Sequence, residues 1–217
     1  VFSTTTMGEV RGGIPYNDLA YFVVGATLYE INSSGTSLAR GTLSTSTGRV
    51  SMAHNGVRTS GNQQIFIADG ANGYIYDNST SILTAISDTD FVSSKTVTFI
   101  DGYFVFNEDS NNGRFWISVL YDGTSILESD FANAEGSPDK IQSLISDNRE
   151  LYLFGTESLE VWYNSGDLDN TFQRYQGGFK QHGCAAPYSP ARFDNTIIWL
   201  SQNERGDGQV VMMGQGY

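Results

Sequence analysis

The sequence predicts an all-β protein, a β-propeller of about five blades built from antiparallel strands. The first observation is a pair of strand-like apolar runs that recurs five times along the 217 residues. The second is the spacing of these pairs, near 40 to 50 residues, which is typical of propeller blades with several strands each. The third is a polar or glycine turn pair in front of each copy. We leave open whether regions outside this chain complete the propeller.

The clearest copy of the repeat runs from Asp147 to Tyr163. An Asp-Asn turn leads into the apolar run LYLF, and a Gly155-Thr156 break separates this run from LEVWY, where polar and apolar residues alternate. A continuous apolar run suits a strand that is buried on both faces, and an alternating run suits a strand with one wetter face. Together they predict a β-hairpin.

The other copies follow the same pattern in chain order. AYFVVG with TLYEI comes first, QIFIADG with GYIYD second, GYFVFN with RFWIS third, and TIIWLS with QVVMM last. Equivalent positions are expected at Phe22, Phe66, Phe104, Tyr152 and Ile198, which gives steps of 44, 38, 48 and 46 residues. The turn pairs are Asn17-Asp18, Gly61-Asn62, Asp101-Gly102, Asp147-Asn148 and Asp194-Asn195. An ordinary β-sandwich with irregularly spaced hairpins is the competing interpretation, and five similar copies favour the propeller.

Each blade should also contain an inner and an outer strand around the hairpin. In the first unit Val10 and Ile14 begin an inner strand and Leu38 to Leu43 form an outer one, after the turn cluster NSSG. Val50 and Met52 open the second unit, and Lys140 to Ile145 open the fourth. The fifth unit stops after its third strand, which predicts an exposed edge unless VFSTT at the N-terminus supplies a fourth strand.

Composition and charge limit the classes of function. Twelve basic and 24 acidic side chains give a net charge of -12, which argues against a surface that grips phosphate backbones. We therefore expect no strong direct binding of nucleic acid. The sequence contains no apolar run of 18 residues, so no membrane contact is expected. Both ends look like cuts, so residues 1–217 are expected to be a single β-propeller domain from a longer protein.

Candidate catalytic and metal-binding residues are few. His54 closes a strand without a neighbouring Asp, Cys or His, so we interpret it as part of a turn. Asn107 to Gly113 (NEDSNNG) is similar to a calcium loop or to an Asp-box, but it departs from both patterns and is better explained as a hairpin turn. His182 and Cys184 would share one face if they lay on a strand, although a small buried cysteine is the preferred interpretation. We thus predict no catalytic residue, cofactor or metal.

Three long blocks of sequence resemble a known protein family. They are GRVSMAHNG from Gly48, AEGSPDKIQSLISDNRELYLFGTESLEVWYNSG from Ala134, and GCAAPYSPARFDNTIIWLSQNERGDGQV from Gly183. These blocks resemble the packaged-DNA stabilisation proteins of short-tailed bacteriophages, also called tail-accessory or head-completion factors. The family's members are roughly twice as long, which implies that the present chain is their propeller-like central part.

The resemblance implies a structural virion protein of the phage neck or tail hub, made in the bacterial host cytoplasm. Such a protein would close the portal channel after DNA packaging, retain the genome and form a platform for the tail needle and tailspikes. The implied partners are the portal-adaptor protein, the needle, the tailspike and further copies of the chain in a ring. The family has no catalytic residues to carry over, so we expect no enzyme.

An acidic chain fits retention by plugging better than retention by gripping, because an acidic lining repels DNA while the ring blocks it. The alternative is a carbohydrate-binding or glycosidase-like propeller, which would gather carboxylates and aromatic side chains at the mouth of its channel. A scaffold propeller of unrelated origin is a third hypothesis. Trp116, Trp162 and Tyr163 are predicted to pack between blades or, alternatively, to contact neighbouring subunits.

Overall fold

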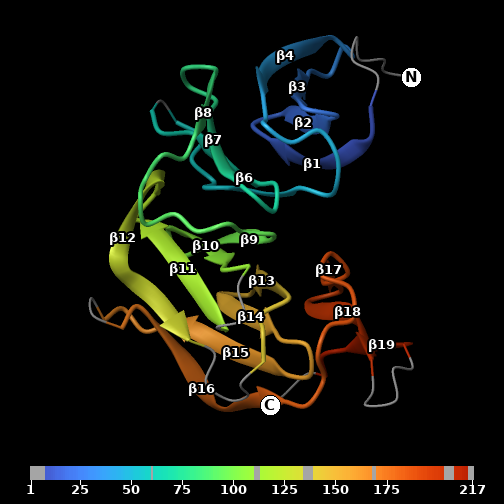
Figure 1. Ribbon diagram of the computed structural model, residues 1–217, viewed down its shortest axis with the longest axis vertical. Coiled ribbons are helices and arrows are strands. Elements are labelled where there is room, and N and C mark those ends of the chain that lie inside the picture. Colours follow the sequence, from blue (N-terminus) through green and yellow to red (C-terminus); the bar gives the residue numbers. More distant parts are fainter. Residues whose placement is uncertain are drawn as a thin grey trace.

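The computed structural model describes residues 8–59, 61–109, 113–133, 139–167, 170–202 and 208–214, with only the backbone given for 127–133. These residues form five antiparallel sheets that follow one another in chain order. In Figure 1 the sheets are arranged as blades around a common centre, from β1–β4 in blue to β17–β19 in red. The predicted β-propeller of about five blades is confirmed.

Four blades have four strands each. Blade 1 consists of β1 (Val10–Tyr16), β2 (Leu19–Val24), β3 (Thr27–Ile31) and β4 (Ser37–Thr42), and blade 2 of β5 (Ser51–His54), β6 (Gln64–Ala68), β7 (Gly73–Asp77) and β8 (Ile82–Ala85). Blade 3 consists of β9 (Val97–Ile100), β10 (Tyr103–Asn107), β11 (Arg114–Val119) and β12 (Asp122–Asn133), and blade 4 of β13 (Ser143–Asp147), β14 (Glu150–Phe154), β15 (Leu159–Asn164) and β16 (Phe172–Lys180). In each, the first strand forms one edge of the sheet, and Figure 1 shows β1, β9 and β13 nearest the centre.

Blade 5 has three strands in the described part of the chain: β17 (Ala191–Phe193), β18 (Thr196–Gln202) and β19 (Gly208–Met212). The expectation that the fifth unit ends after its third strand is confirmed to this extent. VFSTT, which we considered as a fourth strand, lies outside the described residues.

Tight turns connect the first two strands of four blades. Their central pairs are Asn17-Asp18, Asp101-Gly102, Asn148-Arg149 and Asp194-Asn195, and every one of these residues has a positive φ. Two consecutive positive φ values define a type I′ turn, whose twist matches that of the flanking strands. This confirms three of the predicted turn pairs. The pair in blade 4 was wrong by one residue, because Asp147 pairs with Glu150 in the ladder and the turn begins at Asn148.

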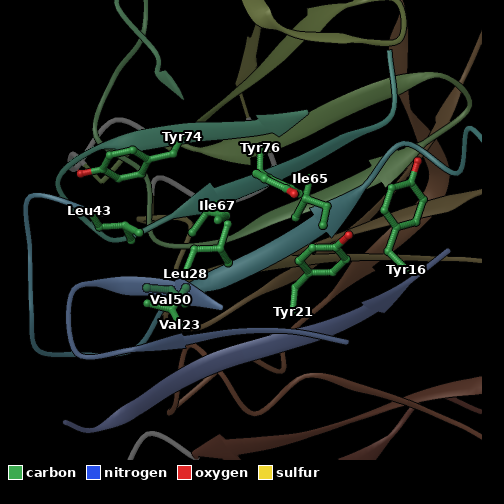
Figure 2. Close-up of a cluster of buried hydrophobic side chains, with 10 residues drawn as sticks. All are labelled: Tyr16, Tyr21, Val23, Leu28, Leu43, Val50, Ile65, Ile67, Tyr74 and Tyr76. Carbon is green, nitrogen blue, oxygen red and sulfur yellow. The ribbon is translucent and has the colours of Figure 1, made fainter. Parts of the chain in front are cut away.

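The hydrophobic core consists of four clusters, one between each pair of consecutive blades. The cluster between blades 1 and 2 packs Tyr21, Val23 and Leu28 against Ile65, Ile67 and the rings of Tyr74 and Tyr76. Figure 2 shows these side chains meeting between two sheets. Equivalent clusters join blades 2 and 3, blades 3 and 4, and blades 4 and 5. Because side chains of a strand alternate between its faces, each middle strand of blades 2, 3 and 4 contributes to two clusters.

A polar network lies inside the first of these interfaces. Glu30, which is 7% exposed, accepts hydrogen bonds from the phenols of Tyr21 and Tyr76 at 3.3 and 3.1 Å. Arg40 binds both carboxylate oxygens of Glu30, at 2.9 and 2.7 Å. Burial of a carboxylate is tolerated here because hydrogen bonds compensate for the lost water.

Candidate functional site: the central cavity

The inner strands enclose a cavity of about 430 Å³ at the centre of the propeller. Its walls come from β1, β5, β9 and β13, and in blade 5 from Arg192 of β17 and the segment around Tyr188 that precedes it. Every blade therefore contributes to it. In propellers the centre of the blades is where a ligand or a catalytic group would be sought, so this cavity is the candidate site.

Hydroxyl groups connect the inner strands around the cavity, and Ser51 and Thr98 among them line it. Thr98 and Ser146 share a hydrogen bond of 2.7 Å between their hydroxyls, and the amide of Ser146 donates to Thr98 Oγ1 at 3.2 Å. Ser51 accepts a hydrogen bond from the amide of Val97 at 3.1 Å. The inner strands belong to different sheets, so these side chains supply the contacts that a backbone ladder would otherwise make. The hydroxyls are thus used for structure.

The two arginines Arg49 and Arg192 carry the charge in the cavity wall, and none of its described lining residues is Asp or Glu. Arg192 donates to the carbonyl of Ser146 at 2.7 Å and lies 3.5 Å from a carboxylate oxygen of Asp147. The guanidinium of Arg49 stands 5.5 Å from the ring centre of Tyr188, in cation-π geometry. A glycosidase needs a pair of carboxylates, so the lining gives no support to the glycosidase-like alternative.

His54 is held by its own strand end. Nδ1 accepts a hydrogen bond from the amide of Gly56 at 3.1 Å, and the ring stacks on Tyr16 with 4.6 Å between centroids. Burial lowers the pKa of His54, and the nearby charges of Arg58 and Arg192 lower it further. A neutral imidazole that accepts at Nδ1 and packs on a ring fits the interpretation of His54 as part of a turn.

His182 and Cys184 do not form a pair of strand residues. Both lie between β16 and β17, outside any strand, with His182 exposed and Cys184 buried. The thiol of Cys184 donates to the carbonyl of Ala186 at 3.0 Å, and burial raises its pKa. Because neither residue lies on a strand, His182 and Cys184 do not share one face of a strand. The preferred interpretation, a small buried cysteine, is confirmed.

The segment Asn107 to Gly113 connects the antiparallel strands β10 and β11, as the hairpin interpretation predicted, although 110–112 lie outside the described residues. Lys95 and Lys140 both donate to Asp109 Oδ1, at 2.9 and 2.5 Å. Burial acts to raise the pKa of Asp109, but the two ammonium groups outweigh it and the pKa is lowered. In the described part of the chain no group of three or more His, Cys, Asp or Glu side chains could hold a metal ion.

The three aromatic residues proposed for subunit contacts differ in burial. Trp116 and Trp162 are 7% and 8% exposed and belong to the clusters between blades 2 and 3 and between blades 3 and 4. Their indole nitrogens donate to Glu108 at 3.0 Å and to Glu160 at 2.8 Å. Tyr163 is half-buried and packs on Tyr175, with 4.5 Å between ring centroids. Packing between blades accounts for both tryptophans, and a role in subunit contacts remains a prediction.

A family model described as Bacteriophage P22 Gp10, beta-propeller matches residues 1–217. The match covers the whole chain, and the described residues have the propeller architecture that the description names. The chain belongs to this family. It is a phage packaged-DNA stabilisation protein of the P22 Gp10 type, as the resemblance implied. No curated protein matches the chain.

Solved structures support the fold of this P22 Gp10-type chain. It aligns with the computationally designed protein Ika8 at a TM-score of 0.58 and 15% identity, over 94% of this chain and 58% of Ika8. PorZ, a surface component of the type-IX secretion system of Porphyromonas gingivalis, aligns at a TM-score of 0.54 and 12% identity, over 94% of this chain and 28% of PorZ. A chain of the mitotic checkpoint complex aligns at a TM-score of 0.57 and 14% identity, over 93% of this chain and 65% of that chain. The chain thus spans less than two thirds of each structure. At these identities the likeness shows the fold alone.

The described residues contain no helix that is long and apolar enough to cross a membrane. The chemistry of the central cavity is that of a structural centre, with hydroxyls and arginines engaged by neighbouring strands. Sequence reasoning predicted inner strands at Ile14, at Val50 and Met52, and at Lys140 to Ile145. It did not identify the hydroxyls and arginines of the cavity, because short inner strands such as SMAH and ARF carry no pattern that marks those side chains.

Proposed function

We propose that this chain is part of a structural virion protein that closes the portal channel after DNA packaging and retains the genome. The match of the P22 Gp10 family to all 217 residues carries this proposal. The protein would lie in the neck or tail hub and provide the platform for the tail needle and tailspikes. It would have no enzymatic activity, consistent with membership of a structural phage family.

Retention would occur by plugging the channel. A net charge of -12 repels the phosphate backbone, and binding of nucleic acid through charge requires clustered Lys and Arg. Basic side chains in this chain are instead used within it: Arg40, Arg174 and Lys140 each form an ion pair with a carboxylate. A ring of such subunits blocks the exit mechanically while its surface repels the strand.

The assembly would be a homo-oligomeric ring in contact with the portal-adaptor protein, the tail needle and the tailspike. Its place would be the tail or neck of the virion, after synthesis in the bacterial host cytoplasm. The solution mass of the intact gene product, measured by light scattering beside the 217-residue chain, tests the ring. A ring for the gene product is the expected result, and monomers both alone and with the adaptor would contradict the proposal.

A retention experiment tests the function. Heads of the phage that encodes this chain are packaged in its absence and then treated with nuclease, with and without added gene product. We expect the DNA to become nuclease-sensitive without the protein and protected with it. Full protection in its absence would refute a role in retention.

A binding experiment tests the mechanism separately. In fluorescence anisotropy with duplex DNA at 150 mM salt, plugging predicts a Kd weaker than about 10⁻⁴ M, the weak limit of ordinary non-specific binding. A tight affinity that falls steeply with salt would show that the protein grips phosphates. That result would refute the plugging mechanism, but it would not contradict a role in retaining the genome.

A further inference from the structure

The inner strands of blades 2, 3 and 4 begin side by side at one end of the central cavity. Ser51 and Val97 are the first residues of β5 and β9, and the amide of Val97 donates to the hydroxyl of Ser51 at 3.1 Å. The amide of Leu144, the second residue of β13, donates at 3.2 Å to the hydroxyl of Thr96, which immediately precedes β9. We call this end of the cavity the starting end.

A basic residue precedes each of these three strands. Arg49 lies two residues before the first residue of β5, Lys95 two residues before that of β9, and Lys140 three residues before that of β13. Because the strands begin together, the three basic residues are placed around the starting end. A chain with a net charge of -12 thus carries a group of cations at its centre.

The carboxylates that these cations bind do not match them in number. Lys95 and Lys140 both donate to the same oxygen, Asp109 Oδ1, at 2.9 and 2.5 Å, so two ammonium groups share one carboxylate. Among the described residues Arg49 forms no hydrogen bond or ion pair, and its guanidinium packs on the ring of Tyr188. A contact with a ring uses no hydrogen-bond acceptor. Within the described part of the chain, the N–H donors of Arg49 therefore have no acceptor.

Two further carboxylates lie near the starting end and are engaged by other groups. Asp69 accepts a hydrogen bond of 2.6 Å from the hydroxyl of Thr45, which in turn accepts one of 2.8 Å from the buried guanidinium of Arg11. Glu9 accepts a hydrogen bond from the amide of Gly48 at 3.3 Å. Neither carboxylate belongs to the described lining of the cavity. A cleft lined by one sign of charge raises the local concentration of counter-ions, which here are anions.

Tyr188 brings a neutral hydrogen-bond donor to the same end. It belongs to the segment before β17 in blade 5, yet the centre of its ring lies 5.5 Å from the guanidinium of Arg49, which precedes β5 in blade 2. Burial raises the pKa of Tyr188, and the charge of Arg49 opposes this only in part, so the phenol keeps its proton at neutral pH. Both side chains line the cavity. A guanidinium and a phenol O–H together offer donors to an anion.

We propose that the starting end of the central cavity binds a compact phosphate anion, held by Arg49 and flanked by Lys95 and Lys140. Guanidinium groups bind pairs of phosphate oxygens, and such charge-assisted hydrogen bonds are stronger than neutral ones. The anion is either free in solution or the terminal phosphate of a nucleic-acid strand, which presents the same oxygen atoms. A cavity of about 430 Å³ is too small for a duplex, so this site is compatible with plugging and does not depend on it.

Titration calorimetry of the intact gene product with sodium pyrophosphate, at constant ionic strength, tests the site. We expect saturable binding with a Kd of about 10⁻³ M or tighter, and Arg49→Gln should weaken it at least about tenfold because charge-assisted hydrogen bonds are lost. Arg49→Lys keeps the charge and should weaken binding less.

Arg149→Gln is the matched control, because Arg149 is 83% exposed and lies in the turn that follows β13, at the opposite end of the inner strands. It should bind pyrophosphate as the wild type does. Absence of saturable binding up to about 10 mM pyrophosphate would overturn the proposal. Equal weakening by Arg49→Gln and Arg149→Gln would also overturn it, because the attraction would then be diffuse.

A competition experiment distinguishes the two sources of the phosphate. A short single strand of thymidines with a 5′-phosphate, and the same strand without it, compete with pyrophosphate for the gene product. Competition by the phosphorylated strand alone supports the site and assigns it to strand ends, and competition by neither strand supports it as a site for a free anion. Equal competition by both strands would show that the protein binds the phosphodiester backbone, and the proposal would fail.

Discussion

Replacement of Arg11 tests whether one buried side chain holds β1 of blade 1 to the connection between β4 and β5. Its side chain is 0% exposed, although it carries a full positive charge. The guanidinium donates to the carbonyls of Gly48, Gly25 and Thr45 at 2.6, 3.1 and 2.8 Å, and to Thr45 Oγ1 at 2.8 Å. It thereby fixes the connection between β4 and β5 against β1.

Replacement of Arg11 by Met keeps most of the volume and removes every donor. Hydrogen bonds from charged groups contribute about 1.5 to 3 kcal/mol each, and an acceptor left buried costs about 1 to 3 kcal/mol. The losses are not additive, and water can reach Gly48, which is exposed. We therefore expect Arg11→Met to lower the free energy of unfolding by about 4 kcal/mol, which is a large part of a typical domain's stability.

Arg11→Lys separates charge from geometry. An ammonium group keeps the charge, but it is a single point that cannot reach the carbonyls of both Gly48 and Gly25 from one position as the planar guanidinium does. We expect this variant to lose about 2 kcal/mol, between wild type and Arg11→Met. If Arg11→Lys loses no free energy of unfolding, the positive charge alone accounts for the stabilisation at this site.

Urea unfolding followed by tryptophan fluorescence measures these differences, with m-values that should not change. Arg149→Met is the control, because its side chain is 83% exposed and its ion pair with Asp101 should contribute less than about 1 kcal/mol. If Arg11→Met costs no more than Arg149→Met, the hydrogen bonds of the buried guanidinium do not stabilise the blade and the reasoning is wrong.

Three further predictions concern pH, packing and reactivity. Burial, followed by the charge of Glu30, raises the pKa of Tyr21, so its contribution to stability should be complete below pH 10 and decline as the pH rises further; a urea midpoint that is constant to pH 11 would contradict this. Gly183→Ala should cost about 3 kcal/mol, because the new Cβ would clash with the carbonyl oxygen of Thr156, whereas Gly214→Ala, with no atom within 4 Å, should be neutral in the same urea titration. Cys184, at 2% exposure and with a raised pKa, should react with a thiol reagent at least about 100-fold more slowly in the native protein than in urea; equal rates would show that the site opens freely.

The repeat was predictable because it rests on strong local signals. Buried runs such as LYLF predict a strand, and turn pairs such as Asp101-Gly102 predict a tight turn, from only a few residues each. The turn of blade 4 was wrong by one residue because Asp147, Asn148 and Arg149 are all polar. Asn148 tolerates the left-handed conformation well, whereas Arg149 gives no such signal in the sequence yet adopts a φ of 64°.

The register of the repeat was not predictable from the same signals. Phe66 faces the following blade, whereas Phe104 packs in the same cluster from the opposite side and so faces the preceding blade. Phe22 also faces backward, since it alternates with Tyr21 and Val23, which face blade 2. A shift of one residue reverses the face of a strand. When both faces are apolar, as in these strands, the sequence holds no hydrophobic pattern that fixes the direction.

The hydroxyl contacts between the inner strands escaped prediction for a different reason. The hydroxyls of Thr98 and Ser146 are 48 residues apart in the chain, and their contact depends on how two sheets are placed around the centre. Nothing in the local sequence distinguishes them from surface threonines and serines. Their partners are fixed only after the inter-blade clusters have formed, since those clusters set the angle between neighbouring sheets.

Turn chemistry and blade cohesion are linked in this chain. Asn and Asp were expected at the turns because they tolerate positive φ, and the same side chains then reach the neighbouring blade: Asn17 donates to Gln63 at 2.9 Å, and Asp101 binds Arg149. A residue type selected for backbone conformation thus also supplies a polar contact on the rim of the propeller. Since the contact of Asp101 with Arg149 is exposed and that of Asn17 with Gln63 is only partly buried, each one contributes little energy, and the buried clusters determine stability. The rim contacts add a polar contribution at the junctions between blades 1 and 2, 3 and 4, and 4 and 5.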